Sequence, residues 1–492
     1  MIAYGALFLW PTVLPLQDTA AATSTARELI VQFCYLTASV MFILGLRALT
    51  RPDQARLGMQ QAAIGMLLAV VGALLHQEIL TYSWILAGLA IGAALGYPMA
   101  TRVSMTAMPQ FIAFSHAFGA IAATLVGVVE YRHVASAVDG AAPTISRSLA
   151  FALGFEVLFG ALTVTGSFMA FGKLQELITG RPITFKGQNF FNGIIALGAI
   201  GCFGMLVTEP TTAWAFYGVV GLALFLGVSL VLPIGGGDMP VVISLLNSYA
   251  GLAASATGFA IGNNVLIIAG ALEGAGGFIL SILMSKAMNR SFGNVLFGAF
   301  GSAPTTAAAG QLAEGLTVRS VSAEDAAVQL AFAKLVIVIP GYGLAVAQAQ
   351  HQVRELAELI EKNGGEVKFA IHPVAGRMPG HMNVLLAEAN LPYEKLLEMD
   401  EINSEFPSAD VALVIGANDV VNPAARHDKA SPIYGMPILD ADKAKSIIVL
   451  KRSMAAGFAG IENELFYDQK CSMLFGDAKK SLTALITEVK AL

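Results

Sequence analysis

Long apolar stretches dominate the first 290 residues of the chain. Nine of them are long enough, or nearly so, to cross a bilayer, for which an apolar helix needs about 20 residues. They cover residues 28–50, 58–76, 82–100, 109–130, 148–171, 190–207, 212–232, 240–260 and 264–287. Several are rich in glycine and alanine, which favours close packing of helices over exposure to lipid. The pattern predicts an α-helical polytopic membrane bundle.

The pattern changes after about residue 325. Short runs of branched residues, typical of buried parallel strands, now alternate with helical patterns. The strand-like runs are Lys334–Ile339, Glu366–Ile371, Val411–Ile415 and Ser446–Leu450. The helical patterns are an amphipathic stretch ending near Lys362, Met382–Asn390 and Asp477–Val489. This alternation predicts an α/β doubly wound parallel sheet of the Rossmann-like kind.

The charge distribution supports the same division. The chain is 56% apolar and 13% charged, whereas a soluble protein has about 25% charged residues. Residues 1–325 contain 27 charged side chains, and the remaining 167 residues contain 36. We therefore expect four segments: an N-terminal extension of unclear status (1–27), a transmembrane domain (28–290), a linker (291–330) and a soluble C-terminal domain (331–492).

Composition also excludes some partners. The net charge is −5 and the chain has no basic tract, so nucleic acid is not an expected partner. The three cysteines, Cys34, Cys202 and Cys471, are far apart and have no metal-ligand spacing. We expect no metal site.

The loop charges predict the orientation of the bundle. If the C-terminal domain is cytoplasmic, nine basic residues lie in cytoplasmic connections and three on the other side, as the positive-inside rule requires. The nine are Arg47, Arg51, Arg56, Arg102, Lys173, Arg181, Lys186, Lys286 and Arg290, and the three are Arg27, Arg132 and Arg147. An odd number of spans then places the N-terminus outside.

Residues 1–16 are apolar but short, and Pro11 and Pro15 interrupt them. No basic region precedes them, so a signal peptide is not well supported. They could form a re-entrant or partial span. Alternatively, the start codon assigned to the gene lies too far upstream, and these residues are not part of the natural protein.

A glycine motif follows the first predicted strand. It reads Gly341-Tyr342-Gly343-Leu344-Ala345-Val346, with valine at the third glycine position of a dinucleotide fingerprint. Such a turn between a strand and a helix directs helix N-terminal amides at a pyrophosphate. The alternative is an ordinary glycine turn of an α/β domain.

Two features favour NADP over NAD. An NAD site needs an acid after the second strand to bind the ribose, but Ile371 is followed by His372-Pro373-Val374-Ala375-Gly376-Arg377, which contains none. Lys451-Arg452-Ser453 directly follows another strand, and two cations with a hydroxyl suit a 2′-phosphate. The alternative is a solvated basic surface. Two further loops at strand ends, Gly416–Asp419 and Gly457–Gly460, are either ligand-binding loops or plain turns.

His116 lies in the middle of the fourth apolar stretch. Gly119, Ala123 and Gly127 follow it at helical spacing, which places the imidazole on a packed face. Histidine titrates near physiological pH and is therefore a natural proton relay. The alternative is a neutral histidine bonded to a neighbouring helix.

The eighth stretch contains a second candidate, Asn247, on a stripe of small polar residues formed by Ser244, Ser248, Gly251 and Ser255. Its amide either serves a proton path or makes a structural bond between helices. Asp238 begins the same helix, where an acid often only caps it. Glu156 and Glu273 also lie in spans, where ionisable groups are costly. Neither is assigned a role.

These stretches together resemble the β subunit of proton-translocating NAD(P) transhydrogenase, over residues 28–492. The matching phrases are those at 340–350, 372–389, 416–419 and 451–454 in the soluble half, and 238–242, 246–249 and 286–292 in the membrane half. The first reads Pro-Gly-Tyr-Gly-Leu-Ala-Val-Ala-Gln-Ala-Gln. Residues 1–27 lie outside the resemblance.

The resemblance implies a function. The C-terminal domain would bind NADP(H), in an orientation reversed relative to most proteins of its fold. A separate α subunit would carry NAD(H), and hydride would pass between the two nicotinamides. Inward proton movement would drive the reduction of NADP. The family functions as a dimer of αβ units in the bilayer, which for this chain implies the bacterial inner membrane with a cytoplasmic C-terminal domain.

The resemblance also implies residue roles. Lys451, Arg452 and Ser453 would hold the 2′-phosphate. The phosphate turn would be Gly341–Gly343 with Val346 behind it, and the loop Val374, Ala375, Gly376 and Arg377 would contact the cofactor. The loops Gly416, Ala417, Asn418, Asp419 and Gly457, Phe458, Ala459, Gly460 would complete the site, with Asp419 linking redox state to proton transfer. Some relatives have tyrosine where Phe458 stands, so a hydroxyl contact would be lost.

In the membrane half, the resemblance implies that His116 and Asn247 belong to the proton path. It places Asp238 and Arg290 near the junction between the bundle and the nucleotide domain. A different reading is a channel or transporter gated by a nucleotide-sensing domain, which would not turn over its nucleotide.

Overall fold

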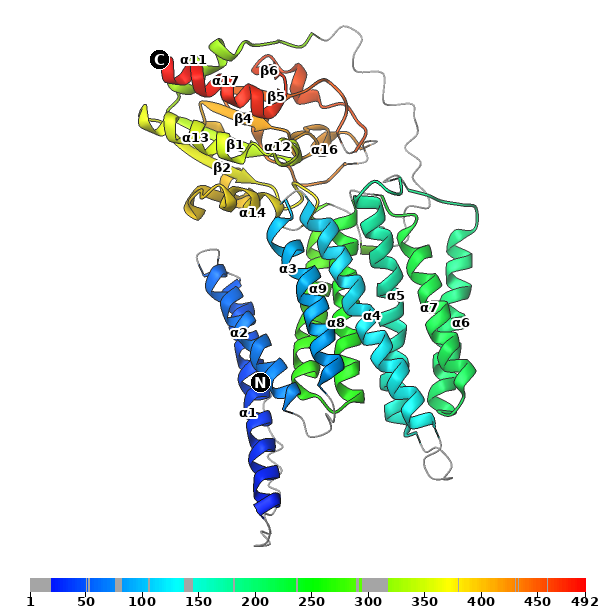
Figure 1. The fold of residues 1–492 in the computed structure, drawn as a ribbon. Coiled ribbons are helices and arrows are strands. Elements are labelled where there is room, and N and C mark those ends of the chain that lie inside the picture. The colour runs from blue at the N-terminus through cyan, green and yellow to red at the C-terminus, as the bar shows by residue number, and fades with distance from the viewer. Residues whose placement is uncertain are drawn as a thin grey trace, which may run out of the picture. The chain divides into compact units, whose positions relative to one another are not determined.

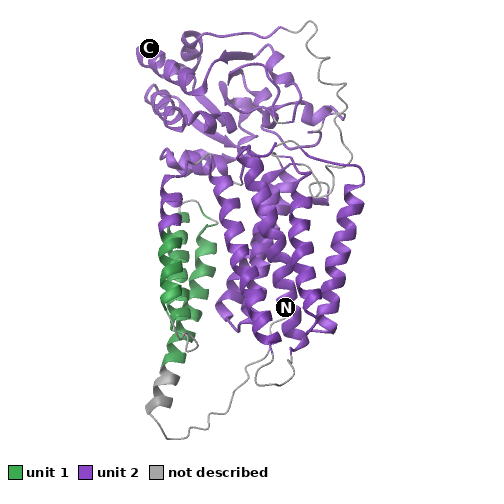
Figure 2. Ribbon diagram, turned by 45° about the vertical axis from the view of Figure 1, so that its right-hand side comes forward, with its two compact units in different colours: residues 1–93 green, residues 94–492 purple. Residues whose placement is uncertain are grey.

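A computed structural model gives the structure of the chain. It describes residues 19–49, 51, 54–75, 82–104, 107–136, 145–179, 182–235, 238–288, 292–293, 317–378, 380–429, 431, 433–457 and 459–492, with side chains from residue 27 onward. The chain forms two compact units, residues 1–93 and 94–492 (Figure 2). Each is described by itself.

The described residues contain nine helices long and apolar enough to cross a membrane (Figure 1). They are α1 (Thr19–Leu49), α2 (Ala55–Leu74), α3 (Ser83–Arg102), α4 (Met108–Ala135), α5 (Arg147–Leu174), α6 (Gln188–Thr208), α7 (Ala213–Val231), α8 (Met239–Ala260) and α9 (Asn264–Ala287). These are the nine spans that the sequence predicts, although α1 begins earlier than expected, at Thr19. The chain is therefore a multi-pass membrane protein.

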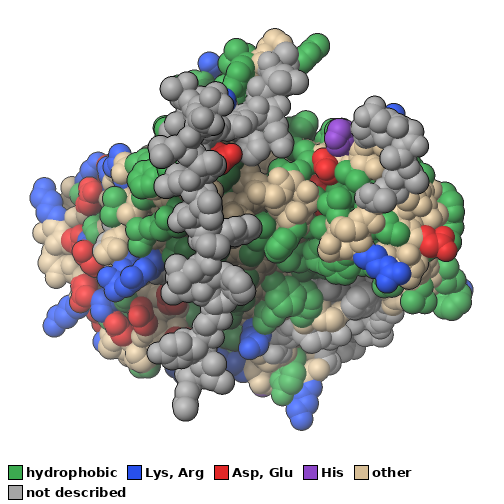
Figure 3. Space-filling view, turned by 90° about the horizontal axis from the view of Figure 1, so that it is seen from below, with side chains coloured by type: hydrophobic (Ala, Val, Ile, Leu, Met, Phe, Trp, Pro, Cys, Tyr) green, Lys and Arg blue, Asp and Glu red, His purple; other side chains and the backbone are tan. Residues whose placement is uncertain are grey.

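Their outward faces suit lipid. Large apolar side chains are exposed on several helices, among them Phe33, Trp84 and Leu197. Figure 3, which shows the molecule from below, has hydrophobic side chains interspersed with charged and other polar ones. In the first unit, Gly58, Gly65 and Gly72 of α2 are the buried face against α1. A Cβ at Gly58 would stand 2.7 Å from the carbonyl oxygen of Gly45. This spacing of seven residues is typical of a tightly packed helix pair.

The C-terminal part contains a six-stranded sheet with the order β3-β2-β1-β4-β5-β6. Its strands, all parallel, are β1 (Leu335–Pro340), β2 (Glu366–Ile371), β3 (Leu396–Glu398), β4 (Val411–Ile415), β5 (Ser446–Lys451) and β6 (Cys471–Phe475). The predicted doubly wound fold is confirmed. The sequence analysis found four of the strands and missed β3 and β6.

Both faces of the sheet are buried, which explains the continuous apolar runs. Val336 and Val338 of β1 pack on the face covered by α11 (Ala323–Ala331), α13 (Gln350–Lys362) and α17 (Ala478–Ala491) (Figure 1). Ile337 and Ile339 pack on the opposite face, against short helices and loops that include Phe406 and Phe466. The fingerprint helix is in fact two helices, because α12 (Tyr342–Ala347) ends at Gln348, whose φ is 48°.

Candidate functional site

The strand order reverses direction between β1 and β4. In open parallel sheets, ligands bind at such a switch point, outside the carboxyl ends of the strands. The two loops that leave β1 and β4 here are Gly341–Gly343 and Gly416–Asp419. The sheet therefore brings together two loops that the sequence analysis named separately.

The two loops touch backbone to backbone. Gly343 donates its N–H to the carbonyl oxygen of Gly416 at 2.9 Å, and Gly341 donates to that of Ile415 at 2.9 Å. A Cβ at Gly343 would stand 2.7 Å from Gly416 Cα, and one at Gly416 would stand 2.4 Å from Gly343 Cα. Gly416 also has a φ of +63°, in the region that only glycine adopts readily. The two loops can therefore lie this close only because glycine stands at these positions.

Val346 occupies the third fingerprint position without strain. The usual glycine there allows close packing of helix on strand, but the Val346 side chain is 49% exposed. Because α12 has only six residues and turns away at Gln348, the valine side chain need not enter the helix–strand contact. The departure from the fingerprint therefore has a local structural cause.

The loop after β4 supports the loop at 457–460. Ala459 donates its N–H to Asp419 Oδ2 at 2.8 Å, and Asn463 donates to the carbonyl oxygen of Asn418 at 3.0 Å. A Cβ at Gly457 would stand 2.4 Å from Asn418 Nδ2. Asp419 thus fastens the second loop to the first. Phe458 lies outside the described residues.

The end of β5 presents Lys451, Arg452 and Ser453. The Lys451 ammonium donates to the carbonyl oxygen of Ala455 at 2.5 Å and lies 4.7 Å from the centroid of the Phe466 ring. Burial lowers the pKa of Lys451, and the nearby Asp419 carboxylate opposes that shift. Arg452 and Ser453 are exposed. The strand end therefore offers an exposed guanidinium and hydroxyl with a half-buried ammonium beside them.

The loop after β2 is fastened by two histidines. His372 is buried; its Nε2–H donates to the carbonyl oxygen of Pro437 at 2.8 Å, and its Nδ1 accepts from Val374 N–H at 3.2 Å. Burial lowers the pKa of His372 to about 4, which agrees with a neutral ring. Ala375 is buried, and Gly376 has a φ of +114° with His381 directly against it. The loop conformation is fixed by these contacts.

Arg377 makes several contacts from this loop. Its guanidinium lies 4.6 Å from the centroid of the Tyr342 ring, and it donates to the carbonyl oxygen of Leu174, the last residue of α5, at 3.3 Å. Its backbone N–H donates to His381 Nδ1 at 3.0 Å. Burial, and then the positive charge of Arg377, lower the pKa of His381 to about 4. Burial raises the pKa of Tyr342, and Arg377 opposes that shift.

The membrane half contains a second polar group, on α4, α8 and α9. Asn247 of α8 donates its side-chain N–H to Glu273 Oε1 of α9. The Glu273 carboxylate lies close enough to the His116 imidazole of α4 to interact with it electrostatically. The structure therefore brings together His116 and Asn247 through Glu273, which the sequence analysis left without a role.

Glycines hold α8 and α9 in register. A Cβ at Gly251 would stand 2.4 Å from Gly274 N, and one at Gly270 would stand 2.4 Å from Ser255 N. Ser248 donates its hydroxyl to the carbonyl oxygen of Gly274 at 2.6 Å. The small polar stripe predicted around Asn247 is thus the seam between the two helices, and it fixes Asn247 beside Glu273.

Asp238 immediately precedes α8. Its carbonyl oxygen accepts from Val242 N–H at 3.2 Å, and its side chain makes no cap bond to the helix. Arg290, which was expected near it, lies outside the described residues.

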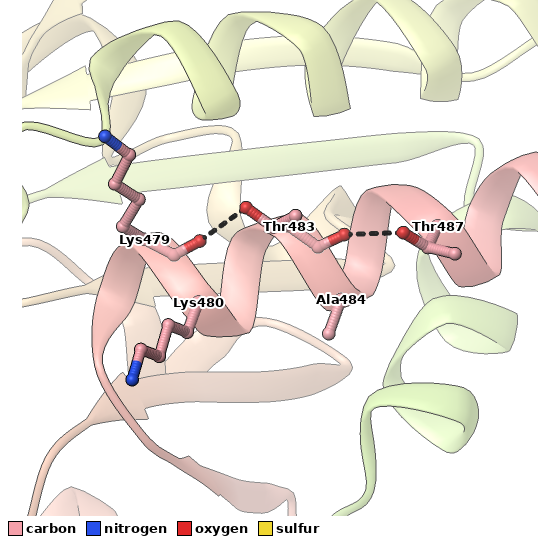
Figure 4. Close-up of a pocket in the computed structure, with 5 residues that line it drawn as sticks. All are labelled: Lys479, Lys480, Thr483, Ala484 and Thr487. Carbon is pink, nitrogen blue, oxygen red and sulfur yellow. Dashed lines mark hydrogen bonds between the residues drawn. The ribbon is translucent and has the colours of Figure 1, made fainter.

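A shallow hollow on α17 is lined by Lys479, Lys480, Thr483, Ala484 and Thr487 (Figure 4). Thr483 and Thr487 donate their hydroxyls to the carbonyl oxygens of Lys479 and Thr483, at 2.8 and 2.9 Å. All five residues come from one helix, and none belongs to the loops at the carboxyl edge. We assign it no function.

Comparison with known proteins decides the family. Residues 31–488 match the family model described as NAD(P) transhydrogenase beta subunit. The chain belongs to this family. It is also 50% identical, over 453 residues, to the NAD(P) transhydrogenase subunit beta of Rhodospirillum rubrum, an alignment that covers 92% of this chain and 97% of that protein. The same identity and coverage hold for the protein of that name from the strain ATCC 11170 of the species.

Membership in the transhydrogenase β family agrees with the structure. A membrane bundle of apolar helices and a doubly wound sheet occur in one chain, and the family acts on nicotinamide nucleotides. The name of the subunit implies an α subunit as its partner. The sequence resemblance and the predicted fold class are both confirmed.

Proposed function

We propose that the chain binds NADP(H) at the carboxyl edge of its sheet and couples hydride exchange with NAD(H) on an α subunit to proton movement. The observation that carries this is a combination at one edge of the sheet. A switch point at which two glycine loops meet lies between β1 and β4, and the exposed Arg452 with the half-buried Lys451 lies at the end of the neighbouring strand β5. The first suits a dinucleotide, and the second suits its extra phosphate.

The residues present fit that cofactor. Gly341, Gly343 and Gly416 let the two loops meet at the switch point, because a Cβ at any of them would clash with the other loop, and a pyrophosphate would bind outside these strand ends. Arg452 and Ser453 are exposed donors for a 2′-phosphate, with the Lys451 ammonium adding charge. The loop around Gly457 and Ala459 would cover the site. A bound nicotinamide supplies the hydride chemistry, and the protein supplies positioning and electrostatics.

The position of the cations supports the reversed orientation. In an ordinary NAD site the adenosine ribose lies at the end of β2, where this chain has His372 and the fixed loop to Arg377. The cations lie instead at β5, beyond β4 on the other side of the switch point. A 2′-phosphate at β5 places the nicotinamide end toward β2, near Val374, Ala375 and Gly376.

Coupling requires that the protonation state of the bundle changes the NADP(H) site. A ligand shifts a conformational equilibrium only through different affinities for the two conformations, and such coupling is reciprocal. We place the titrating group at His116, beside the hydrogen-bonded pair of Asn247 and Glu273. Arg377, which reaches the end of α5, and Asp419, which fastens the 457–460 loop, are the residues through which the change would reach the nucleotide. Asp238 and Arg290 would act at the same junction.

The location and partners follow from the same proposal. The transmembrane domain extends over 28–290, and a linker at 291–330 leads to the NADP(H) domain at 331–492. The C-terminal domain is cytoplasmic and the bundle lies in a bacterial inner membrane, because basic residues are concentrated on that side of the predicted topology. The NAD(H)-binding α subunit completes the enzyme, as a dimer of αβ units.

Reconstitution tests this function. The chain is placed in liposomes with and without its α subunit, and turnover of an NADP analogue by NADH is measured together with the internal pH. Turnover linked to a pH change, only when the α subunit is present, supports the proposal. Nucleotide-dependent proton flux without turnover would instead show a channel or transporter gated by a nucleotide-sensing domain.

A further inference from the structure

Glu156 of α5 is a second acid inside the bundle. Its side chain is fully buried, with 0% exposed. Gly127 of α4 faces it, and a Cβ at that glycine would stand 3.0 Å from the Glu156 carboxyl carbon. Thr257 of α8 also contacts it. A carboxyl enclosed by three membrane helices is costly and is a functional candidate by default.

The hydrogen bonds around Glu156 fit two protonation states. Thr257 Oγ1 lies 2.7 Å from Glu156 Oε1 and 3.0 Å from the carbonyl oxygen of Ala253. A hydroxyl has one hydrogen and two lone pairs, so it donates to one of these oxygens at a time. An ionised Glu156 accepts from Thr257. A protonated Glu156 donates to Thr257 Oγ1, whose own hydrogen then turns to Ala253.

Three of the helices packed on α5 offer Glu156 no counter-charge. Helices α6, α7 and α8 have no charged side chain along their whole lengths, and their titratable groups are Cys202, Tyr217 and Tyr249. The charged group that acts on Glu156 is Glu130 of α4, one turn beyond Gly127 and followed by Arg132 and His133. Glu156 Oε2 has no hydrogen-bond partner in the described part of the chain. Among the described residues, no cation forms an ion pair with Glu156.

Glu156 lies nearer to one end of the bundle than the polar group formed by His116, Asn247 and Glu273. Thr257 is ten residues beyond Asn247 on α8, and Gly127 is eleven beyond His116 on α4, which is about 15 Å in each case. Both displacements run toward the connection between α4 and α5. In the proposed topology this is the outer half of the membrane.

We propose that Glu156 is a proton-binding group of the proton route, placed between the outer surface and His116. This rests on the proposed function. One proton from water near Glu130 adds to the Glu156 carboxylate. It leaves again through water to the His116 imidazole, whose Nδ1 has no hydrogen-bond partner among the described residues. No electron moves. The Thr257 hydroxyl turns once in each direction and stabilises both states.

Glu156→Gln tests the role directly, in the complete enzyme in liposomes with its α subunit. We expect proton uptake and coupled turnover to fall at least tenfold, while NADPH affinity stays within twofold of the parent. Glu209→Gln, at the exposed end of α6, is the matched control and should leave both unchanged. In infrared spectra, the carbonyl band of a protonated carboxylic acid should be lost in Glu156→Gln and retained in the control.

Thr257→Val tests the two-state geometry. It should shift the pH dependence of turnover and the position of the same infrared band. Thr163→Val is its control, because the buried Thr163 hydroxyl donates to the carbonyl oxygen of Phe159 in its own helix. A merely structural hydroxyl would change stability without moving the pH profile.

Equal proton uptake, the same pH profile and an unchanged band in Glu156→Gln would overturn the inference. If Glu156→Gln fails to assemble, Glu156→Asp decides, since a shifted band with slowed coupling supports the inference and parental behaviour contradicts it. Failure of the parent enzyme to move protons would reject the proposed function instead. The two failures are therefore distinguishable.

Discussion

Glycines bring two backbones into contact in two regions of this molecule, with different results. On the α8–α9 seam, Gly251 and Gly270 lie in regular helix and remove side chains from a long contact. At the switch point, Gly343 and Gly416 join two loops at a single point, and Gly416 has a positive φ. The seam aligns neighbouring side chains, Asn247 and Glu273, whereas the switch point joins the loops that follow β1 and β4.

The difference shows how the same residue type can contribute in two ways to the proposed proton site and the proposed nucleotide site. Along the seam, hydroxyl bonds such as Ser248 to Gly274 fix the rotation of one helix on the other, and the side chains beside the contact form the proposed proton site. At the switch point, the contact between the loops is itself part of the proposed nucleotide site. Substitutions at the two places should therefore fail in different ways.

The largest effect is expected for Gly416→Ala. The new Cβ would lie 2.4 Å from Gly343 Cα at a φ of +63°, so it meets both a clash and backbone strain of about 1–3 kcal/mol. Isothermal titration should show NADPH affinity reduced on the order of a hundredfold or more. Gly364→Ala has a φ of +93° and open space around it, so it carries the strain alone and should bind normally. Equal losses in both variants would refute the role of the contact.

A smaller effect is expected for Arg452→Ala. Loss of one charge-assisted hydrogen bond costs about 1.5–3 kcal/mol, or roughly ten- to hundredfold in affinity. The loss should be specific to NADPH over NADH and should shrink at high salt. Lys445→Ala removes a cation that is paired with Asp410 just before β5. It should change neither the NADPH affinity nor its salt dependence. If Arg452→Ala left the NADPH affinity unchanged, the 2′-phosphate would not bind at the end of β5.

Gly251→Ala sharpens the membrane side of the comparison. Its Cβ would lie 2.4 Å from Gly274 N, and such overpacking costs about 1–3 kcal/mol. We expect a lower unfolding temperature in detergent and slower proton uptake, with NADPH affinity unchanged. Gly221→Ala in α7 meets open space and provides the control. If proton uptake persisted in full, the alignment of Asn247 with Glu273 would not matter to transport.

The smallest effect concerns pH and the β2 loop. The pKa of His372 falls from its ordinary value to about 4 in the folded chain, so the unfolded state binds more protons below about pH 6.5. The stabilisation is complete above that pH and is lost as the pH falls toward 4. From pH 7 to 5.5 the loop should lose about 1 kcal/mol. Hydrogen exchange of β2 and residues 372–378, corrected for intrinsic rates, measures the loss. His372→Gln should remove the part that His372 contributes and leave the part that comes from His381.

Much of the fold could be predicted from sequence, because long apolar runs and branched strand runs are local signals. The nine spans and four strands were found in this way. Strand β3 has three residues, and β6 lies between charged residues at Asp468–Lys470 and Asp477, so neither gives a clear run. The break at Gln348 was also missed, because a positive φ at a single glutamine has no sequence signal.

The site could be predicted only in part. The loops at 341–343, 416–419 and 451–453 each follow a strand, so their meeting at one edge follows from the parallel sheet. The partner of Asn247 could not be predicted, because the rotation of α8 against α9 decides which side chain it meets. The same holds for Glu156 and Thr257, which are 101 residues apart in sequence.

The most direct test is the NADPH dissociation constant of the αβ enzyme in liposomes, measured against pH for the parent chain and for His116→Ala. The account predicts that affinity changes with pH in the parent, by about tenfold for each linked proton per pH unit, and that His116→Ala abolishes this dependence while NADPH still binds. An affinity that is the same at every pH in the parent, or a pH dependence that survives in His116→Ala, would contradict it.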